Sequence, residues 1–282
     1  MVRSLKITAI VENTAGVFNS IGEWGLSLWI EADRHRLLYD TGQGRSLLKN
    51  ARLLRIDLKT AEVLVTSHGH NDHTGGIAKL MAAGFRGKVY AHPAAFAKKY
   101  QREPNSVAGR SKGIPDACEQ ALRRWASEIV DSSAPTEIAP GMIVTGSIPR
   151  RTDFEDTGGA FFLDQACTKP DPLIDDQALL IETSRGWVVI TGCGHAGVVN
   201  TVKHALEITG ADRIHAVVGG MHLANASEHR IKATAEELEN LGVEFIAPCH
   251  CTGFAATGFF QSQFGAQVVV LRAGLSCRFG EE

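Results

Sequence analysis

The chain has 282 residues, of which 44% are hydrophobic and 21% are charged, and its formal net charge is -2 at pH 7. This is ordinary globular composition, and the absence of any block of like charge argues against an extended nucleic-acid or membrane-surface site. No apolar segment has the length of a secretion signal or a membrane span, so we expect a cytoplasmic protein whose six cysteines are free thiols.

The first part of the chain alternates apolar runs of strand length with helical patterns. These runs predict strands at 5–11, 26–30 and 36–39, a helix at 45–53, a strand at 62–66, a helix at 77–83, a strand at 88–91 and a helix at 94–100. The strand at 62–66 leads directly into a histidine-rich run, which places candidate functional side chains at a strand end.

Two segments interrupt this regularity. Residues 95–135 contain a polar stretch rich in loop-forming residues and a predicted helix at 117–127, and we interpret them as a variable insertion. Residues 150–176 form a long mixed loop, and loops of this length are commonly lids or substrate walls. We therefore interpret residues 1–282 as a single domain with one insertion and one long loop.

The second half is more regular. Its pattern predicts strand-like segments around a turn at 137–145, a hairpin of strands at 178–181 and 187–190, and then a helix at 197–209, a strand at 214–218, a helix at 227–241, a strand at 243–247, a helix at 255–264 and a strand at 268–271. Strands that are adjacent early and alternate with helices late predict an α/β fold. We expect two mixed sheets covered by helices, with functional sites at strand ends.

Residues 66–76 read Thr-Ser-His-Gly-His-Asn-Asp-His-Thr-Gly-Gly and carry the most chemical information in the chain. Four potential metal ligands, His68, His70, Asp72 and His73, fall within six positions directly after an apolar strand. A lone histidine is usually a surface or packing residue, but four such groups in the pattern H-x-H-x-D-H favour a metal site. Histidine together with carboxylate suits zinc, iron or manganese, so we predict part of a two-metal centre.

Three later histidines each follow a predicted strand. His195 lies in the turn Gly-Cys-Gly-His-Ala-Gly and His250 in Pro-Cys-His-Cys-Thr-Gly, and we predict both as metal ligands in preference to turn-stabilising residues. His222, in Gly-Met-His-Leu, is open to three roles: ligand, substrate contact or proton donor. The two cysteines flanking His250 are interpreted as packing or neighbouring residues, because a structural zinc site would need a second ligand pair at similar spacing.

Two other residues are predicted to lie beside the ligands. Asp40 ends an apolar strand in Tyr-Asp-Thr-Gly, where it either orients a metal-binding histidine or caps the turn. Cys193 lies in the same glycine-rich turn as His195 and is placed next to the metal site. The remaining histidines are expected to be surface or packing residues: His35, His92, His204, His215 and His229.

The pattern His68-x-His70-x-Asp72-His73, with later strand-end histidines, resembles the metallo-β-lactamase superfamily. Further segments look like one subgroup, named for an archaeal dihydropterin–aminobenzene-phosphate synthase of methanopterin biosynthesis: 11–15, 24–27, 40–43, 192–197, 220–223 and 248–253. The motifs are specific and the match runs over nearly the full chain, with gaps mainly in 95–135 and 152–175.

The resemblance implies a four-layer αββα sandwich with two divalent metal ions at one edge, most readily zinc, with iron or manganese as alternatives. It implies that His68 and His70 help to hold the first metal. It also implies that Asp72, His73 and His250 hold the second.

The sequence departs from the superfamily pattern in one respect. Many members carry a further histidine before the turn at 192–197 and a metal-bridging aspartate just after it begins. This sequence has Asp175 and Asp176 and then Cys193 at those places. We therefore expect His195 to substitute as a ligand, with Asp176 as the alternative.

Three functions are open at this point. The first is a metal-dependent hydrolase of a small ester, phosphoester or related anionic molecule. In it, Asp72 orients water or accepts a proton, and His222 stabilises negative charge or donates to the leaving group. The second is a phosphoribosyl-type transferase like the synthase of the subgroup, and the third is a non-catalytic metal-binding protein. Fold analogy does not choose between them.

Basic residues in the irregular segments could reach an anionic substrate. They are Arg110, Lys112, Arg150 and Arg151, although solvated surface charge is the favoured interpretation for all four. We expect no nucleic-acid or membrane partner, and the sequence does not indicate an oligomeric state.

Overall fold

Two β-sheets lie face to face in the structure, a computed structural model that describes residues 1–103, 106 and 108–280. The larger sheet has seven strands, in the spatial order β16 (Ser276–Gly280), β1 (Ser4–Val11), β2 (Ser27–Ala32), β3 (His35–Tyr39), β4 (Val63–Val65), β5 (Lys88–Ala91) and β8 (Glu128–Asp131). The second sheet has six, in the order β15 (Phe245–Pro248), β14 (Ile214–Gly219), β13 (Gly186–Thr191), β12 (Leu179–Thr183), β10 (Met142–Val144) and β9 (Thr136–Ala139). A small third sheet contains β11 (Phe161–Phe162), β6 (Tyr100–Gln101) and β7 (Arg110–Ser111).

Alternating side chains join the two large sheets through one core. In β12, Leu179 and Ile181 pack between the sheets, whereas Leu180 packs on the opposite face among helix residues. In β4, Val63 and Val65 face the shared core and Leu64 faces away from it. Because successive side chains of a strand point to opposite faces, strands that are apolar throughout are buried on both sides.

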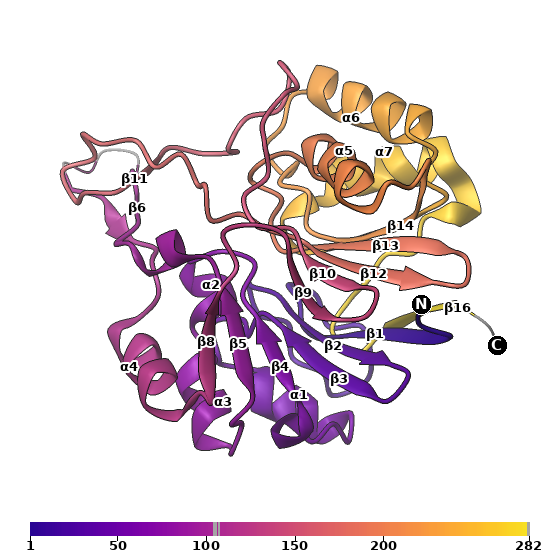
Figure 1. Ribbon diagram of the computed structural model, residues 1–282. Helices are drawn as coiled ribbons and strands as arrows, with labels where there is room; N and C mark the ends of the chain where they lie inside the picture. The colour runs from indigo at the N-terminus through magenta and orange to yellow at the C-terminus, as the bar shows by residue number, and fades with distance from the viewer. Residues whose placement is uncertain (104–105, 107, 281–282) are drawn as a thin grey trace.

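Helices cover the two outer faces (Figure 1). The helices α1 (Leu47–Leu53), α3 (Ile77–Ala82) and α4 (Asp116–Trp125) contribute buried residues to a core cluster with the outer face of the seven-stranded sheet. On the six-stranded sheet the same role falls to α5 (Val198–Thr209), α6 (Glu228–Asn240) and α7 (Phe254–Phe264). The predicted α/β class and four-layer αββα sandwich are therefore confirmed. None of the helices in the described part of the chain is long and apolar enough to cross a membrane.

The structure differs from the predicted elements at 94–100 and at 268–271, and it contains strands that were not predicted: β6, β7, β8 and β11. The helix expected at 94–100 is only a 3-10 turn, Pro93–Phe96, after which the chain enters β6. Within the described residues, 268–271 forms no named strand, and the last strand is β16, which pairs with β1. Strand β8 was not predicted; it pairs in parallel with β5. The pairings of β8 with β5 and of β16 with β1 join segments distant in sequence, which local propensity does not register.

Candidate metal centre

The predicted site residues meet where five strands end: β3, which precedes Asp40, and β4, β13, β14 and β15. After β4 the chain turns through 66–70, and one turn of helix, α2 (Asn71–Thr74), carries Asp72 and His73. Gly69 lets this turn lie against the backbone at Ala95, because a Cβ there would come within 2.2 Å of the Ala95 carbonyl oxygen. The other three candidate residues follow β13, β14 and β15: His195, His222 and His250.

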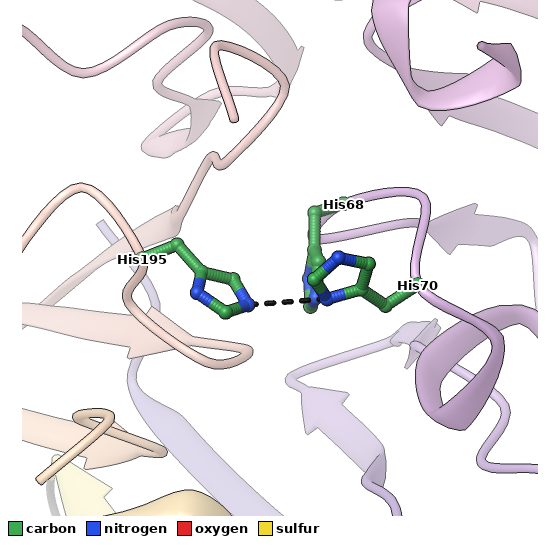
Figure 2. Close-up of side chains that lie close together, drawn as sticks. All are labelled: His68, His70 and His195. Atoms are coloured by element: carbon green, nitrogen blue, oxygen red, sulfur yellow. Dashed lines mark hydrogen bonds between the residues drawn. The ribbon is translucent and has the colours of Figure 1, made fainter. Parts of the chain in front are cut away.

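The first cluster consists of His68, His70 and His195, whose candidate ligand atoms all lie within 4.8 Å of one another. Figure 2 shows the rings turned toward one another, with His195 Nε2 3.2 Å from His70 Nδ1. His195 Nδ1 donates to the carbonyl oxygen of Thr157 at 2.8 Å, which leaves a lone pair on Nε2 facing the cluster. The sequence prediction paired His68 with His70, and the structure adds His195 to them.

The second cluster consists of Asp72, His73 and His250. His73 Nε2 lies 3.2 Å from His250 Nε2, and Asp72 Oδ2 lies 3.8 Å from that same His250 nitrogen. His250 Nδ1 donates to Asn13 Oδ1 at 3.0 Å, while the Trp24 indole donates to Asp72 Oδ2 at 3.1 Å. His250 therefore has one ring nitrogen held by the protein and the other directed at the cluster, whereas Asp72 Oδ2 both accepts from Trp24 and faces His250.

Asp40 lies behind both clusters, fully buried. Its carboxylate accepts hydrogen bonds from the backbone N–H of Ser67 at 2.7 Å, from the Ser67 hydroxyl at 2.6 Å and from His73 Nδ1 at 2.7 Å. Because the Ser67 hydroxyl proton goes to Asp40, Ser67 Oγ accepts from His68 Nδ1 at 2.8 Å. Of the two roles left open for Asp40, the geometry matches orientation of a histidine.

Electrostatics keep most of these rings neutral. Burial lowers the pKa of His68, His195 and His250, and it lowers the pKa of His70 to about 3. His73 differs: burial alone would lower its pKa, but the charge of Asp40 and the hydrogen bond to it raise the pKa to about 9.

Asp72 is also perturbed. Burial acts to raise its pKa, but the neighbouring histidines His73 and His250 outweigh burial and hold the pKa below its ordinary value. Neutral imidazoles beside an ionised carboxylate are the protonation states that metal ligands require, and His73, whose pKa is raised, would lose a proton on binding a metal.

Two observations test whether these residues suit divalent metal ions. The Nε2 atoms of His68 and His70 are buried and have no hydrogen-bond partner among the described residues, which is costly unless something else binds them. The donor set of imidazole nitrogens with one carboxylate is also the one that zinc and iron prefer. The two clusters therefore fit two divalent ions.

Cys193 and His222 lie beside the clusters. Cys193 Sγ is 3.1 Å from His73 Nε2, and burial raises the pKa of its thiol well above the ordinary value. His222 Nε2 donates to the carbonyl oxygen of Gly158 at 3.0 Å, and its Nδ1 has no partner among the described residues. Both residues share a group of candidate ligand atoms with His195.

The remaining residues for which the sequence analysis made a prediction, Asp176 and five histidines, lie outside the two clusters. Asp176 belongs to none of the candidate metal groups in the described residues; its Oδ2 accepts from the Ala196 N–H at 2.7 Å, and burial raises its pKa to about 7. Four of the five other histidines bond to or lie near ordinary polar partners, as expected: His35, His92, His204 and His215. The fifth, His229, lines a cavity next to the site.

The sequence interpretation gave no role to several residues that position the site. Candidate ligands or their supporting carboxylate are hydrogen-bonded by three such residues: Ser67, Asn13 and Trp24. Asn13 and Trp24 lie in segments that resemble the subgroup, and Ser67 lies in the histidine-rich run. Their position within these motifs could have marked them as part of the site, but residue type alone does not identify a hydrogen-bond partner far along the chain.

A buried ion-pair network supports the turn between His68 and His70. Lys99 is 1% exposed, and its Nζ contacts Asp171 at 2.8 Å and Asp175 at 2.9 Å. The other oxygen of Asp175 accepts from the Gly69 N–H at 2.8 Å. Residues of the insertion and of the long loop thus hold the backbone that carries the first cluster.

A four-layer αββα sandwich with two adjacent histidine-rich clusters at one edge defines a metallo-β-lactamase fold. The chain belongs to the metallo-β-lactamase superfamily, whose family model matches residues 25–207.

Similar proteins extend this finding over the full chain. A Methanocaldococcus jannaschii 7,8-dihydropterin-6-methyl-4-(beta-D-ribofuranosyl)-aminobenzene-5'-phosphate synthase is 34% identical, covering 99% of this chain and 98% of that protein. A second M. jannaschii protein, of uncharacterised function, is 31% identical over 89% of this chain and 91% of its own length. A solved structure described as a metal-dependent hydrolase of the beta-lactamase superfamily has 31% identity and a TM-score of 0.82, covering 98% of this chain and 100% of that one.

Metal content tests the two clusters separately. Elemental analysis should find up to two metal ions per chain, and His70→Ala and His250→Ala should each lower the content by about one ion, because each removes a ligand of a different cluster. His229→Ala, a histidine outside both clusters, is the control and should keep full content. Full content in both cluster variants would show the assignment to be wrong.

The Lys99 network can be tested by stability. Lys99→Met leaves two buried carboxylates without their cation, so it should lower the free energy of unfolding by about 3–5 kcal/mol in urea denaturation. Lys98→Met removes a neighbouring lysine whose ion pair with Asp116 is exposed and screened by solvent, and it should change the free energy of unfolding much less. Equal effects of the two substitutions would contradict a supporting role for the buried pair.

Proposed function

We propose that this chain is a metal-dependent hydrolase that activates water against a small ester, phosphoester or related anionic molecule. Its cofactors would be two divalent metal ions, zinc first and iron or manganese as alternatives. The observation that carries the proposal is the pair of adjacent clusters: the first contains two buried imidazole nitrogens without partners among the described residues, and the second contains the ionised carboxylate of Asp72.

The two clusters would divide the metals between them. His68, His70 and His195 would hold one, and Asp72 with His73 and His250 would hold the other. Bound there, two divalent ions would lower the pKa of water and stabilise the negative charge that develops on the substrate.

The chain's own residues would orient the reaction. Trp24 holds one oxygen of Asp72, so this carboxylate is positioned to orient a water molecule or to accept its proton. His222 keeps one nitrogen on Gly158 and leaves Nδ1 free, next to His195, to contact a leaving group or a negatively charged oxygen. Both side chains line the cavity of about 170 Å³ at the centre.

An anionic substrate is supported by the surroundings of this cavity. Lys112 lines it together with Asp72, whereas Arg110, Arg150 and Arg151 bond to other protein groups. A second cavity of about 450 Å³ adjoins the first and shares its wall at Gly158, His222 and Asn225.

The wall of the second cavity carries a buried arginine that forms an ion pair with an exposed aspartate. The Arg230 side chain is 6% exposed and pairs with Asp156, which is 74% exposed, while Arg230 Nε has no partner among the described residues. A carboxylate so accessible can be displaced by a phosphate or carboxylate of a substrate, whereas the arginine stays in place. This cavity is therefore proposed as the place of the substrate's anionic group.

Hydrolysis can be measured directly. The metal-loaded protein should hydrolyse at least one of p-nitrophenyl acetate, p-nitrophenyl phosphate and bis(p-nitrophenyl) phosphate, and chelated protein should not. Asp72→Asn should lower kcat by about 10²–10⁴-fold if the carboxylate handles the proton.

A second assay separates hydrolysis from another candidate, a phosphoribosyl transferase, which is favoured by the name of the 34% identical relative. Pyrophosphate released from phosphoribosyl pyrophosphate only when an aminobenzoate is present would overturn the hydrolase proposal. A fully metal-loaded protein that turns over nothing in either assay would instead be a metal-binding protein without catalysis.

Two substitutions in the second cavity, which is proposed to bind the anionic group of the substrate, should change KM in opposite directions. On a phosphoester that is hydrolysed, Arg230→Gln should raise KM about tenfold or more, since a hydrogen bond to a charged group is worth about 1.5–3 kcal/mol. Asp156→Asn removes the competing carboxylate and should lower KM about two- to fivefold, the range expected for an exposed ion pair. Asp153→Asn, on the same cavity wall, is the matched control and should change KM less. A higher KM in Asp156→Asn would contradict displacement.

A further inference from the structure

A further cavity, of about 820 Å³, lies between β15 and β16, the edge strands of the two large sheets. We call it the edge cavity. It is lined by His215 near the start of β14, by Phe245 at the start of β15 and by the whole of β16, whereas the metal centre gathers where β14 and β15 end. None of the described residues that line it also lines the two cavities at the centre. The edge cavity is therefore a separate site.

The inner wall of the edge cavity is apolar and aromatic. His215 is 3% exposed, and its ring packs edge-on against Phe245 and Phe279, with ring centroids at 5.3 and 5.8 Å. Ile246 and Ala247 also line the cavity and are buried. Small-molecule sites of this size are typically apolar and aromatic, with a few polar groups fixed in position. Such a wall favours a ligand with a flat aromatic body.

The buried imidazole of His215 offers one polar atom to such a ligand. His215 Nδ1 donates to Glu244 Oε2 at 2.8 Å, and the other oxygen of Glu244 pairs with Arg213 at 3.0 Å, so the ring is held in one orientation. His215 Nε2 forms no hydrogen bond within the described part of the chain, although the residue lines the cavity. A ligand hydroxyl suits this nitrogen, because a hydroxyl can both donate and accept.

The mouth of the edge cavity is positively charged. Arg185 and Arg278 both line it and are exposed, and neither pairs with a carboxylate within residues 1–103, 106 and 108–280. No acidic residue is among the described residues of the lining, although the chain as a whole carries a net charge of -2. Guanidinium groups in this situation attract anions, and their planar fork matches the two oxygens of a carboxylate.

We propose that the edge cavity binds a small aromatic carboxylate that carries a hydroxyl group. The ring of the ligand would lie against Phe245 and Phe279, and its hydroxyl would reach His215 Nε2. Its carboxylate would pair with Arg185 and Arg278 at the mouth. The proposal goes beyond the proposed hydrolysis and does not depend on it, because the edge cavity shares no described lining residue with the cavities at the centre.

Titration calorimetry of the metal-loaded full chain tests the proposal with two probes, 6-hydroxy-2-naphthoate and 2-naphthoate. Both should bind, and the hydroxylated probe should bind about three- to tenfold more tightly, the range expected for one additional hydrogen bond. His215→Phe keeps an aromatic ring but removes the nitrogen. It should therefore bind 2-naphthoate as before and lose the preference for the hydroxylated probe.

The charge at the mouth is tested by the double variant Arg185→Gln with Arg278→Gln. It should weaken the binding of both probes about tenfold or more, since hydrogen bonds to charged groups are among the stronger ones. Arg230→Gln, in the cavity that adjoins the metal centre, is the matched control and should leave the binding unchanged.

A blocked mouth gives an independent test of the location. Val269 lines the edge cavity and is 48% exposed, so Val269→Trp should obstruct entry and abolish the binding of both probes. Leu48→Trp, at a position 38% exposed on α1, is its control and should bind normally.

Glu281 and Glu282 follow Gly280 in the sequence and lie outside the described residues. A chain that ends at Gly280 should bind both probes at least as tightly, because it lacks two negative charges. The proposal is overturned if the full chain binds neither probe, if this shortened chain binds more weakly, or if the arginine double variant or Val269→Trp binds as the unmodified protein does. A preference for the hydroxylated probe that persists in His215→Phe would equally contradict it. Failure of hydrolysis with normal probe binding would affect the proposed reaction alone.

Discussion

The carboxylate of Asp40 is the interaction on which the centre depends. It is completely buried, and an unpaired charge at such a place would be strongly destabilising, so its three hydrogen bonds are obligatory. One of these comes from His73 in the second cluster. Another comes from the Ser67 hydroxyl, which in turn accepts from His68 in the first cluster. A single carboxylate therefore sets the tautomer of one histidine in each cluster and directs both free nitrogens outward.

The layered fold makes this arrangement possible. Asp40 follows β3 and Ser67 follows β4, which run parallel to each other, so both residues emerge at the same edge of the larger sheet. The parallel run of β13, β14 and β15 brings Cys193, His222 and His250 to that edge from the other sheet. The core between the sheets fixes their separation, and side chains from distant parts of the sequence consequently meet.

The irregular segments complete the centre. The long loop supplies the Thr157 carbonyl that orients His195 and the Gly158 carbonyl that binds His222. It also supplies Asp171 and Asp175, which meet Lys99 from the insertion beneath the first cluster. The segments with the least regular structure thus orient groups whose positions must be accurate, while Asp156 of the same loop pairs with Arg230 in an adjoining cavity.

The sequence by itself determined the superfamily, the sandwich and the identity of the candidate ligands, because short motifs of neighbouring residues indicate all three. The spacing from His68 to His73, the apolar runs before each strand-end histidine and the glycine-rich turns need no knowledge of distant partners. Only the tertiary structure decided that His195 joins His68 and His70, and that Cys193 lies next to residues of both groups. It also decided the pairing of β16 with β1 and the partners of Lys99. These contacts join residues far apart in the chain, and their energies depend on burial and geometry that no local pattern of residues specifies.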